Sequence, residues 1–135
     1  MAGYSATPLW KKLGYSPGLR AHVDSGPDDY LKLLDLPATV PVEWAARLEK
    51  GIRFAHIFVT RASELKRKLA TCRNRIAPDG AIWISWPKKA SRMETDITED
   101  TIRKLALPMG WVDIKVCAVD EVWSGLKLVV RRELR

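Results

Sequence analysis

The run Phe54-Ala55-His56-Ile57-Phe58-Val59-Thr60 decides the fold class that we predict for this chain. It is apolar on both faces, as a strand buried beneath helices on both sides would be. In the next segment, 63–76, apolar side chains recur at helical spacing, at Leu65, Leu69, Cys72 and Ile76. We therefore expect a central strand followed by a helix that packs its apolar stripe against the sheet.

Strands and helices continue to alternate toward the C-terminus. Pro78-Asp79-Gly80 is a turn signal, and the bulky run 81–86 after it predicts a strand that stops at Pro87. Asp96-Ile97-Thr98-Glu99 fits the spacing of a capping box, which predicts a helix that continues to about Leu107.

The last predicted elements are two strands, 112–119 and 126–133, joined as a hairpin by segment 120–125. At the other end of the chain, Thr7 is placed to cap a short helix that has Pro8 in its first turn and Gly14 at its end. A strand over 19–24 and a helix over 27–36 should follow.

Segment 42–49 has two interpretations. Its alternating apolar residues predict a strand, although Pro41 and Gly51 would also bracket a helix. The link to the central strand is short, and a parallel crossover needs a dozen or more residues. A strand here should therefore be short, antiparallel or at an edge of the sheet.

The order of elements predicts an α/β fold, namely a single three-layer, Rossmann-like domain over residues 1–135 with a mostly parallel sheet ending in an antiparallel hairpin. The length is that of one ordinary domain, and the 47% hydrophobic and 29% charged residues are close to the globular average. Because the chain has no apolar run of about 20 residues and no signal-like start, we expect a cytoplasmic protein.

The two cysteines, Cys72 and Cys117, lie far apart and have no metal-ligand spacing, so we expect core residues and no metal site. His22 and His56 both fall in predicted strands. If those strands are neighbours, the two rings approach each other as a general base or a metal pair, although separate core histidines are commoner. No known catalytic motif is present, so no catalytic residue is predicted.

The chain is basic, with a formal net charge of +7. Much of the excess lies in segment 61–75, where Lys66, Arg67 and Arg73 are candidate contacts for non-specific nucleic-acid binding. The alternative is a solvated helix face that keeps the protein soluble.

Ligands of open α/β sheets bind outside the carboxyl ends of the strands, where the strand order reverses. The residues that we predict there are Asp24, Ser25, Thr60, Ser85, Lys88, Lys89, Ser91, Asp120, Glu121 and Trp123. Lys88 and Lys89 suit a phosphate or a carboxylate, with Ser91 nearby. Asp120, Glu121 and Trp123 offer acids and an aromatic platform, although a hairpin loop of this composition needs no function to explain it.

The part of the chain from Phe54 onward resembles class I S-adenosylmethionine-dependent methyltransferases, whose sheet also finishes with a parallel strand and an antiparallel hairpin. Such enzymes have a glycine-rich turn after their first strand, whereas Val23-Asp24-Ser25-Gly26-Pro27 has one glycine and a proline. They also end their second strand with an acid for the ribose hydroxyls, for which Glu49 is a poor substitute.

The chain as a whole also looks like a small bacterial family without an assigned activity. The residues that carry this likeness are Gly3-Tyr4-Ser5, Trp86-Pro87-Lys88-Lys89-Ala90-Ser91 and Val116-Cys117-Ala118-Val119-Asp120-Glu121.

Three functions follow from these observations. The leading prediction is a non-catalytic binding or regulatory domain that holds a small anionic ligand at Lys88 and Lys89. The alternative is a compact, methyltransferase-like enzyme with an atypical cofactor loop, and the third is nucleic-acid binding through the basic helix. The sequence does not identify a cofactor.

Overall fold

The computed structural model describes residues 7–135, and these contain one sheet with the strand order β2-β1-β3-β4-β6-β5. The strands are β1 (Arg20–Asp24), β2 (Glu43–Trp44), β3 (Phe54–Phe58), β4 (Ala81–Pro87), β5 (Trp111–Ala118) and β6 (Trp123–Val130). β2, β1, β3 and β4 are parallel, and β6 is antiparallel to both β4 and β5. The predicted α/β fold, a mostly parallel sheet that ends in an antiparallel hairpin, is confirmed.

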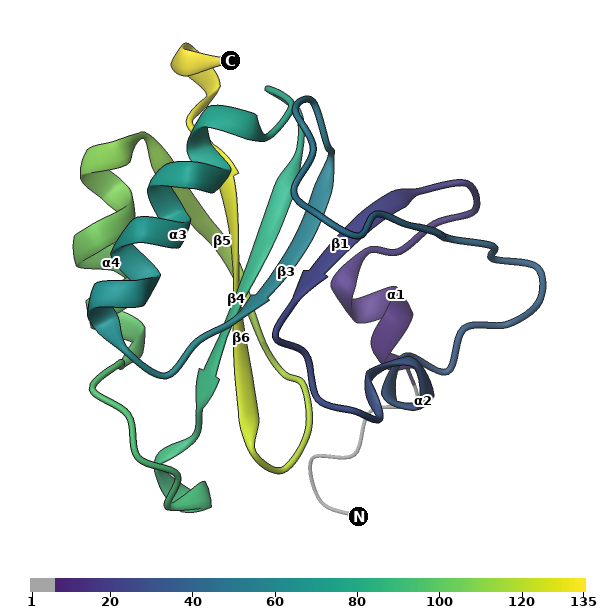
Figure 1. Ribbon diagram of the computed structural model, residues 1–135, viewed down its shortest axis with the longest axis horizontal. Coiled ribbons are helices and arrows are strands. Elements are labelled where there is room, and N and C mark those ends of the chain that lie inside the picture. The colour runs from purple at the N-terminus through teal and green to yellow at the C-terminus, as the bar shows by residue number, and fades with distance from the viewer. Residues whose placement is uncertain (1–6) are drawn as a thin grey trace.

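Helices cover both faces of the sheet (Figure 1). The helices are α1 (Leu9–Leu13), α2 (Tyr30–Leu34), α3 (Ala62–Arg75) and α4 (Glu99–Ala106). Short 3-10 turns are η1 (Lys89–Ser91), η2 (Leu107–Met109) and η3 (Arg132–Leu134). Helices α3 and α4 lie on one face, and α1 and α2 lie on the opposite face (Figure 1).

Alternation along β3 and β4 divides the core between these two faces. Ala55, Ile57, Ile82 and Ile84 pack with α3 and α4, whereas Phe54, Phe58 and Trp83 pack with α1 and α2. All five residues of β3 are buried, as expected for a strand with helices on both sides.

Several predicted boundaries are wrong, and the uncertain segment is the clearest case. Only Glu43–Trp44 forms a strand in segment 42–49, and this strand pairs with Arg20 and Ala21 of β1 in parallel. It is short and at the edge of the sheet, as predicted, but it is not antiparallel. The link to β3 contains no helix, although it carries the chain past β1 to the other side of that strand.

The second helix is also shorter than the predicted 27–36, because Pro27 to Asp29 form a turn before Tyr30. In the hairpin, β6 begins at Trp123 rather than Leu126, because Asp120 Oδ1 accepts hydrogen bonds from the amides of Val122 and Trp123 and tightens the loop. Residues Gly3-Tyr4-Ser5 lie outside the described part of the chain.

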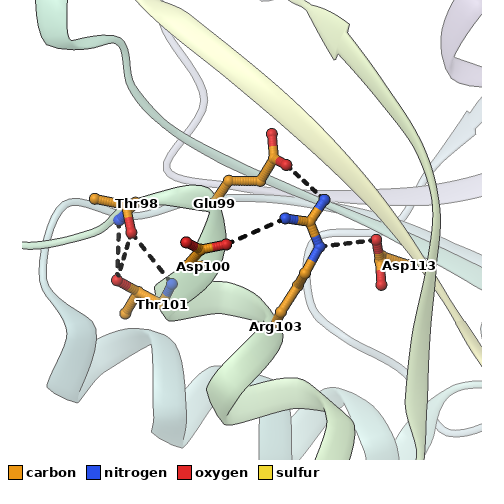
Figure 2. A network of polar contacts seen from close by, with 6 residues as sticks. All are labelled: Thr98, Glu99, Asp100, Thr101, Arg103 and Asp113. Carbon is orange, nitrogen blue, oxygen red and sulfur yellow. Dashed lines mark hydrogen bonds and ion pairs between the residues drawn. The ribbon is translucent and has the colours of Figure 1, made fainter.

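The capping box of α4 is displaced from its predicted position. Thr98 Oγ1 accepts from the Thr101 amide at 3.2 Å, and Thr101 Oγ1 accepts from the Thr98 amide at 3.1 Å (Figure 2). Asp96, the predicted cap of this helix, instead accepts from the amide of Ala62 at the start of α3. Arg103 joins α4 to the sheet through Asp113 of β5, at 3.0 Å (Figure 2).

Among residues 7–135, no helix is long and apolar enough to cross a membrane.

Candidate functional site

The strand order reverses at β1. From β1 the chain moves outward to β2 and then returns to place β3 on the other side of β1. The carboxyl ends of the parallel strands and the loop between β5 and β6 share one edge of the sheet, because Pro87 pairs with Trp123 at the start of β6. This edge is where an open α/β sheet binds ligands. All the predicted site residues except Ser85, which lies inside β4, and Trp123, which begins β6, follow or end a strand there.

Asp24 and Ser25 form the end of β1. Asp24 Oδ2 lies 2.9 Å from Lys68 Nζ of α3, and Ser25 Oγ donates to Asp24 Oδ1 at 2.8 Å. Burial alone would raise the pKa of Asp24, but the hydrogen bonds from Lys68 and Ser25 hold this pKa below its ordinary value. The Asp24 carboxylate is thus ionised and already engaged within the protein.

The turn after β1 is tightly built. Ser25 has a φ of 61°, a left-handed conformation that is uncommon for a residue other than glycine. A Cβ added to Gly26 would lie 2.8 Å from Val23 Cγ1, so only glycine fits against the strand. Backbone strain and close approach of this kind concentrate at functional sites.

Two other predicted residues already have partners inside the protein. The carbonyl of Thr60, after β3, accepts hydrogen bonds from the Thr95 hydroxyl and the Asp96 amide. Ser85 lies within β4, fully buried, with its hydroxyl 2.7 Å from His56 Nε2. Ser85 is therefore a core residue rather than part of the edge.

Lys88, Lys89 and Ser91 form a fixed loop after β4. The Lys88 amide donates to Val122 of the hairpin at 2.7 Å, and Ser91 Oγ donates to the Lys88 carbonyl at 2.6 Å. In the hairpin, the Asp120 carboxylate is occupied by its own loop, Glu121 is exposed, and the Trp123 ring lies edge-on to Phe58 at 5.1 Å. The loop and the hairpin thus lie side by side.

A groove of about 350 Å³ lies on the opposite side of β1 from these loops. The turn after β1, α2 and β2 form its walls, through Val23, Gly26, Pro27, Asp28, Tyr30, Leu31 and Trp44. Trp44 and Leu31 keep 39% and 60% of their surface exposed. A cluster of exposed apolar side chains in a concave site is typical of a ligand groove. Asp28 is the one charged residue among these lining residues.

A buried chain of hydrogen bonds supports the wall of this groove. Tyr30 Oη lies 2.7 Å from Tyr15 Oη and 2.7 Å from His56 Nδ1, and His56 Nε2 contacts Ser85 Oγ. Burial lowers the pKa of His56 to about 3 and raises the pKa of both tyrosines. All four groups are therefore neutral near pH 7, and they fix α2 to β3 and β4.

The two histidines do not approach each other, so of the two interpretations from sequence the commoner one, separate histidines, is the one observed. Their strands are neighbours, but His22 pairs with Ala55 and His56 pairs with Val23, so the two rings point to opposite faces of the sheet. His22 Nδ1 donates to the Ala45 carbonyl at 3.0 Å on the face covered by α3. Among residues 7–135, no group of three or more His, Cys, Asp or Glu side chains is arranged to hold a metal ion.

The basic residues of α3 do not act as one surface. Lys68 is held between Asp24 and Glu64, each at 2.9 Å, with 13% of its side chain exposed. Arg73 Nε donates to the Met109 carbonyl at 3.0 Å and so links α3 to η2. Lys66 and Arg67 stay exposed, which leaves two of the three predicted nucleic-acid contacts facing solvent.

Sequence reasoning missed the groove because it did not distinguish Trp44 from two other tryptophans of the chain, Trp83 and Trp111. The latter two are fully buried, but Trp44 lies on a two-residue edge strand. One sequence signal could have indicated the exposure of Trp44. This residue lies in segment 42–49, which a short link joins to the central strand, and we expected a strand in such a segment to be at an edge of the sheet. Cys72 is a buried core residue as predicted, and Cys117 is half-buried.

Comparison with solved structures identifies methyltransferase folds. A TehB-like S-adenosylmethionine-dependent methyltransferase from Corynebacterium glutamicum aligns with a TM-score of 0.56 at 11% identity, over 96% of this chain and 91% of that one. A magnesium protoporphyrin IX methyltransferase from Synechocystis with bound S-adenosylmethionine aligns with a TM-score of 0.58 at 12% identity, over 91% of this chain and 74% of that one.

A possible exported protein from Bordetella parapertussis gives a TM-score of 0.64 at 9% identity, over 91% of this chain and 66% of that one. The chain spans 47% of LepI in complex with S-adenosylmethionine. No family model and no curated protein matches the sequence. At these identities the comparisons establish a methyltransferase-like, Rossmann-type fold and nothing finer.

Proposed function

We propose that this chain binds an adenosyl ligand, S-adenosylmethionine or its demethylated product, in the groove beside Trp44, as a methyltransferase-like protein. The observation that carries the proposal is the half-exposed Trp44 in a groove next to the turn after β1, where the strand order reverses. The solved methyltransferases with the same fold support it.

The lining of the groove fits the adenosine part of such a ligand. The Trp44 ring offers a face for stacking an adenine base, and Leu31 and Pro27 offer apolar contact. Asp28 is exposed and can accept hydrogen bonds from ribose hydroxyls or from an ammonium group. When bound, S-adenosylmethionine supplies a methyl group carried on a positively charged sulfur.

The charge of the groove favours a neutral or cationic ligand. Its lining contains Asp28 and neither lysine nor arginine, and Asp29 follows at the start of α2. A triphosphate would therefore be repelled, whereas a sulfonium would be attracted. The solved methyltransferases with the same fold support this methyltransferase-like alternative better than our leading prediction from sequence, a small anion at Lys88 and Lys89.

Two features of the expected cofactor site differ here. Gly26 is the only glycine in the turn, and it packs against Val23 instead of leaving space for a ligand. Glu49, the possible ribose acid, is bound by Arg20 at 2.6 and 2.8 Å near the amino end of β1, away from the groove. We therefore assign binding mainly to aromatic and apolar contact, and we assign no catalytic residue.

Calorimetric titration with S-adenosylhomocysteine tests the proposal. Base stacking on an aromatic side chain is worth about 1–3 kcal/mol, so Trp44→Ala should weaken binding by roughly 5- to 150-fold. Leu31→Ala should weaken it less, and Leu107→Ala, which changes another exposed leucine outside the groove, should leave it unchanged. Absence of binding to the wild-type protein at millimolar ligand, or equal affinity in Trp44→Ala, would refute the proposal.

A further inference from the structure

Three lysines gather on the face of the β5–β6 hairpin that is turned toward α1. Lys115 and Lys127 are directly opposite each other in the antiparallel pairing of β5 and β6. Lys115 Nζ donates to the backbone carbonyl of Lys12 at 3.1 Å, and the charges of Lys12 and Lys115 both act on Cys117 of β5. We call Lys12, Lys115 and Lys127 the lysine cluster.

The ammonium group of Lys127 is partly enclosed. Lys127 Nζ lies 5.9 Å from the centre of the Trp83 ring, and a Cβ added to Gly14 would lie 3.4 Å from it. Burial and the nearby charge of Lys115 both lower the pKa of Lys127. The Lys127 ammonium group thus lies between α1 and the sheet, next to the positive charge of Lys115.

No carboxylate balances these charges. None of the ion pairs found among residues 7–135 includes a member of the lysine cluster. The first six residues of the sequence contain neither Asp nor Glu, so that segment cannot supply one. Arg20, Lys68 and Arg103, by contrast, each contact two or more acids.

Folding by itself does not explain this arrangement. Like charges directly opposite on neighbouring strands destabilise a sheet. Carbonyl groups at the end of α1 offset part of this repulsion. The Leu13 carbonyl accepts from Trp83 Nε1, however, and the Lys12 carbonyl is the acceptor for Lys115 Nζ. A stability cost that the protein itself does not offset is expected where a ligand is bound.

We propose that the lysine cluster binds a small anion that carries a phosphate group. The neighbouring ammonium groups of Lys115 and Lys127 suit the high charge and multiple oxygens of a phosphate, which lysine binds as a point charge. Cys117 lies nearby, and burial raises the pKa of its thiol, so it adds no negative charge against the anion. The site is separate from the Trp44 groove, which lies at the opposite end of the sheet, and it does not depend on the proposed function.

Thermal unfolding with and without pyrophosphate tests this inference. In the wild-type protein, millimolar pyrophosphate should raise the Tm by several degrees more than sodium chloride of equal ionic strength. Lys115→Met and Lys127→Met should abolish this extra rise, and because they relieve repulsion they should not lower the Tm of the free protein. Lys104→Met, on the other face of the sheet, is the matched control and should keep the extra rise.

Three outcomes would overturn the inference. An equal rise with chloride would mean that salt only screens the lysines, and an equal rise with acetate would exclude selectivity for phosphate. A lower Tm in Lys115→Met and Lys127→Met together with an unchanged response to pyrophosphate would make the cluster a cap for α1.

Discussion

At His56, a titratable ring is fully enclosed and bonded at both nitrogens, to Tyr30 and Ser85. Burial disfavours the charged imidazolium and lowers the pKa of His56 to about 3. The unfolded chain has no such restriction, and its histidines titrate near pH 6.5. The folded and unfolded states therefore differ in proton uptake over the range between these two values.

The first prediction follows from this difference. Because the folded pKa is lower, the stabilisation is fully present above pH 6.5 and is lost as the pH falls toward 3. Between pH 6.5 and pH 5 the wild-type protein should lose on the order of 1–2 kcal/mol of unfolding free energy through this group. His56→Gln, which keeps polar atoms but does not titrate, should lose less over the same interval.

Urea unfolding at a series of pH values measures both proteins. The two proteins differ only at position 56, so all other contributions to the pH dependence cancel in the comparison. The same pH dependence in wild type and His56→Gln would show that the ring is accessible to protons in the folded state.

Single residues also mark the limit of prediction from sequence. Composition and position suffice to expect a buried, hydrogen-bonded histidine, and His56 is one. They do not reveal that Trp44 is half-exposed, because its exposure depends on α2 being short and on β2 ending after two residues. The groove is thus a consequence of tertiary structure.

At the scale of elements, the link between α3 and α4 has the most direct consequence. The backbone amides at the start of a helix lack intrahelical acceptors. Asp96 Oδ1 accepts from the Ala62 amide at 2.7 Å, and the Thr60 carbonyl accepts from Thr95 Oγ1 at 2.7 Å. The segment that precedes α4 therefore fixes the start of α3.

We expect Asp96→Ala to lower the unfolding free energy by about 1 kcal/mol, the usual cost of removing such a cap. Asp96→Asn keeps an acceptor oxygen and should cost less. Asp100→Ala removes a carboxylate that is 90% exposed and 3.4 Å from Arg103, so it should change stability only slightly. Chemical denaturation of the three variants provides the comparison, and an equal loss in Asp96→Ala and Asp100→Ala would contradict this role for Asp96.

Most elements were predictable because their signals are local. The apolar stripe of α3, the turn Pro78-Asp79-Gly80 and the hairpin all depend on nearby residues. The capping box was assigned to Asp96 and Glu99 because their spacing fits, whereas Thr98 and Thr101 form it in the structure. Spacing alone does not say that Asp96 would have a partner 34 positions away in α3.

At the scale of the whole molecule, the sheet order β2-β1-β3-β4-β6-β5 gathers the loops of one edge and places the reversal of strand order at β1. The alternation of elements was enough to predict an α/β sheet and the final hairpin. The parallel direction and the extent of β2 were not predictable, because a two-residue strand carries little sequence signal. The same holds for the candidate site. The sequence predicted that ligands bind at the carboxyl ends of the strands, but it did not predict the Trp44 groove there.

The central claim is that an adenosyl ligand occupies the Trp44 groove. The most direct test is the two-dimensional NMR spectrum of the 15N-labelled chain during titration with S-adenosylhomocysteine, and separately with ATP. We predict that S-adenosylhomocysteine shifts the signals of residues 23–31 and of Trp44, and that ATP leaves these signals in place. Shifts confined to residues 88–92 with ATP, and none with S-adenosylhomocysteine, would contradict the claim and restore the anion-binding hypothesis.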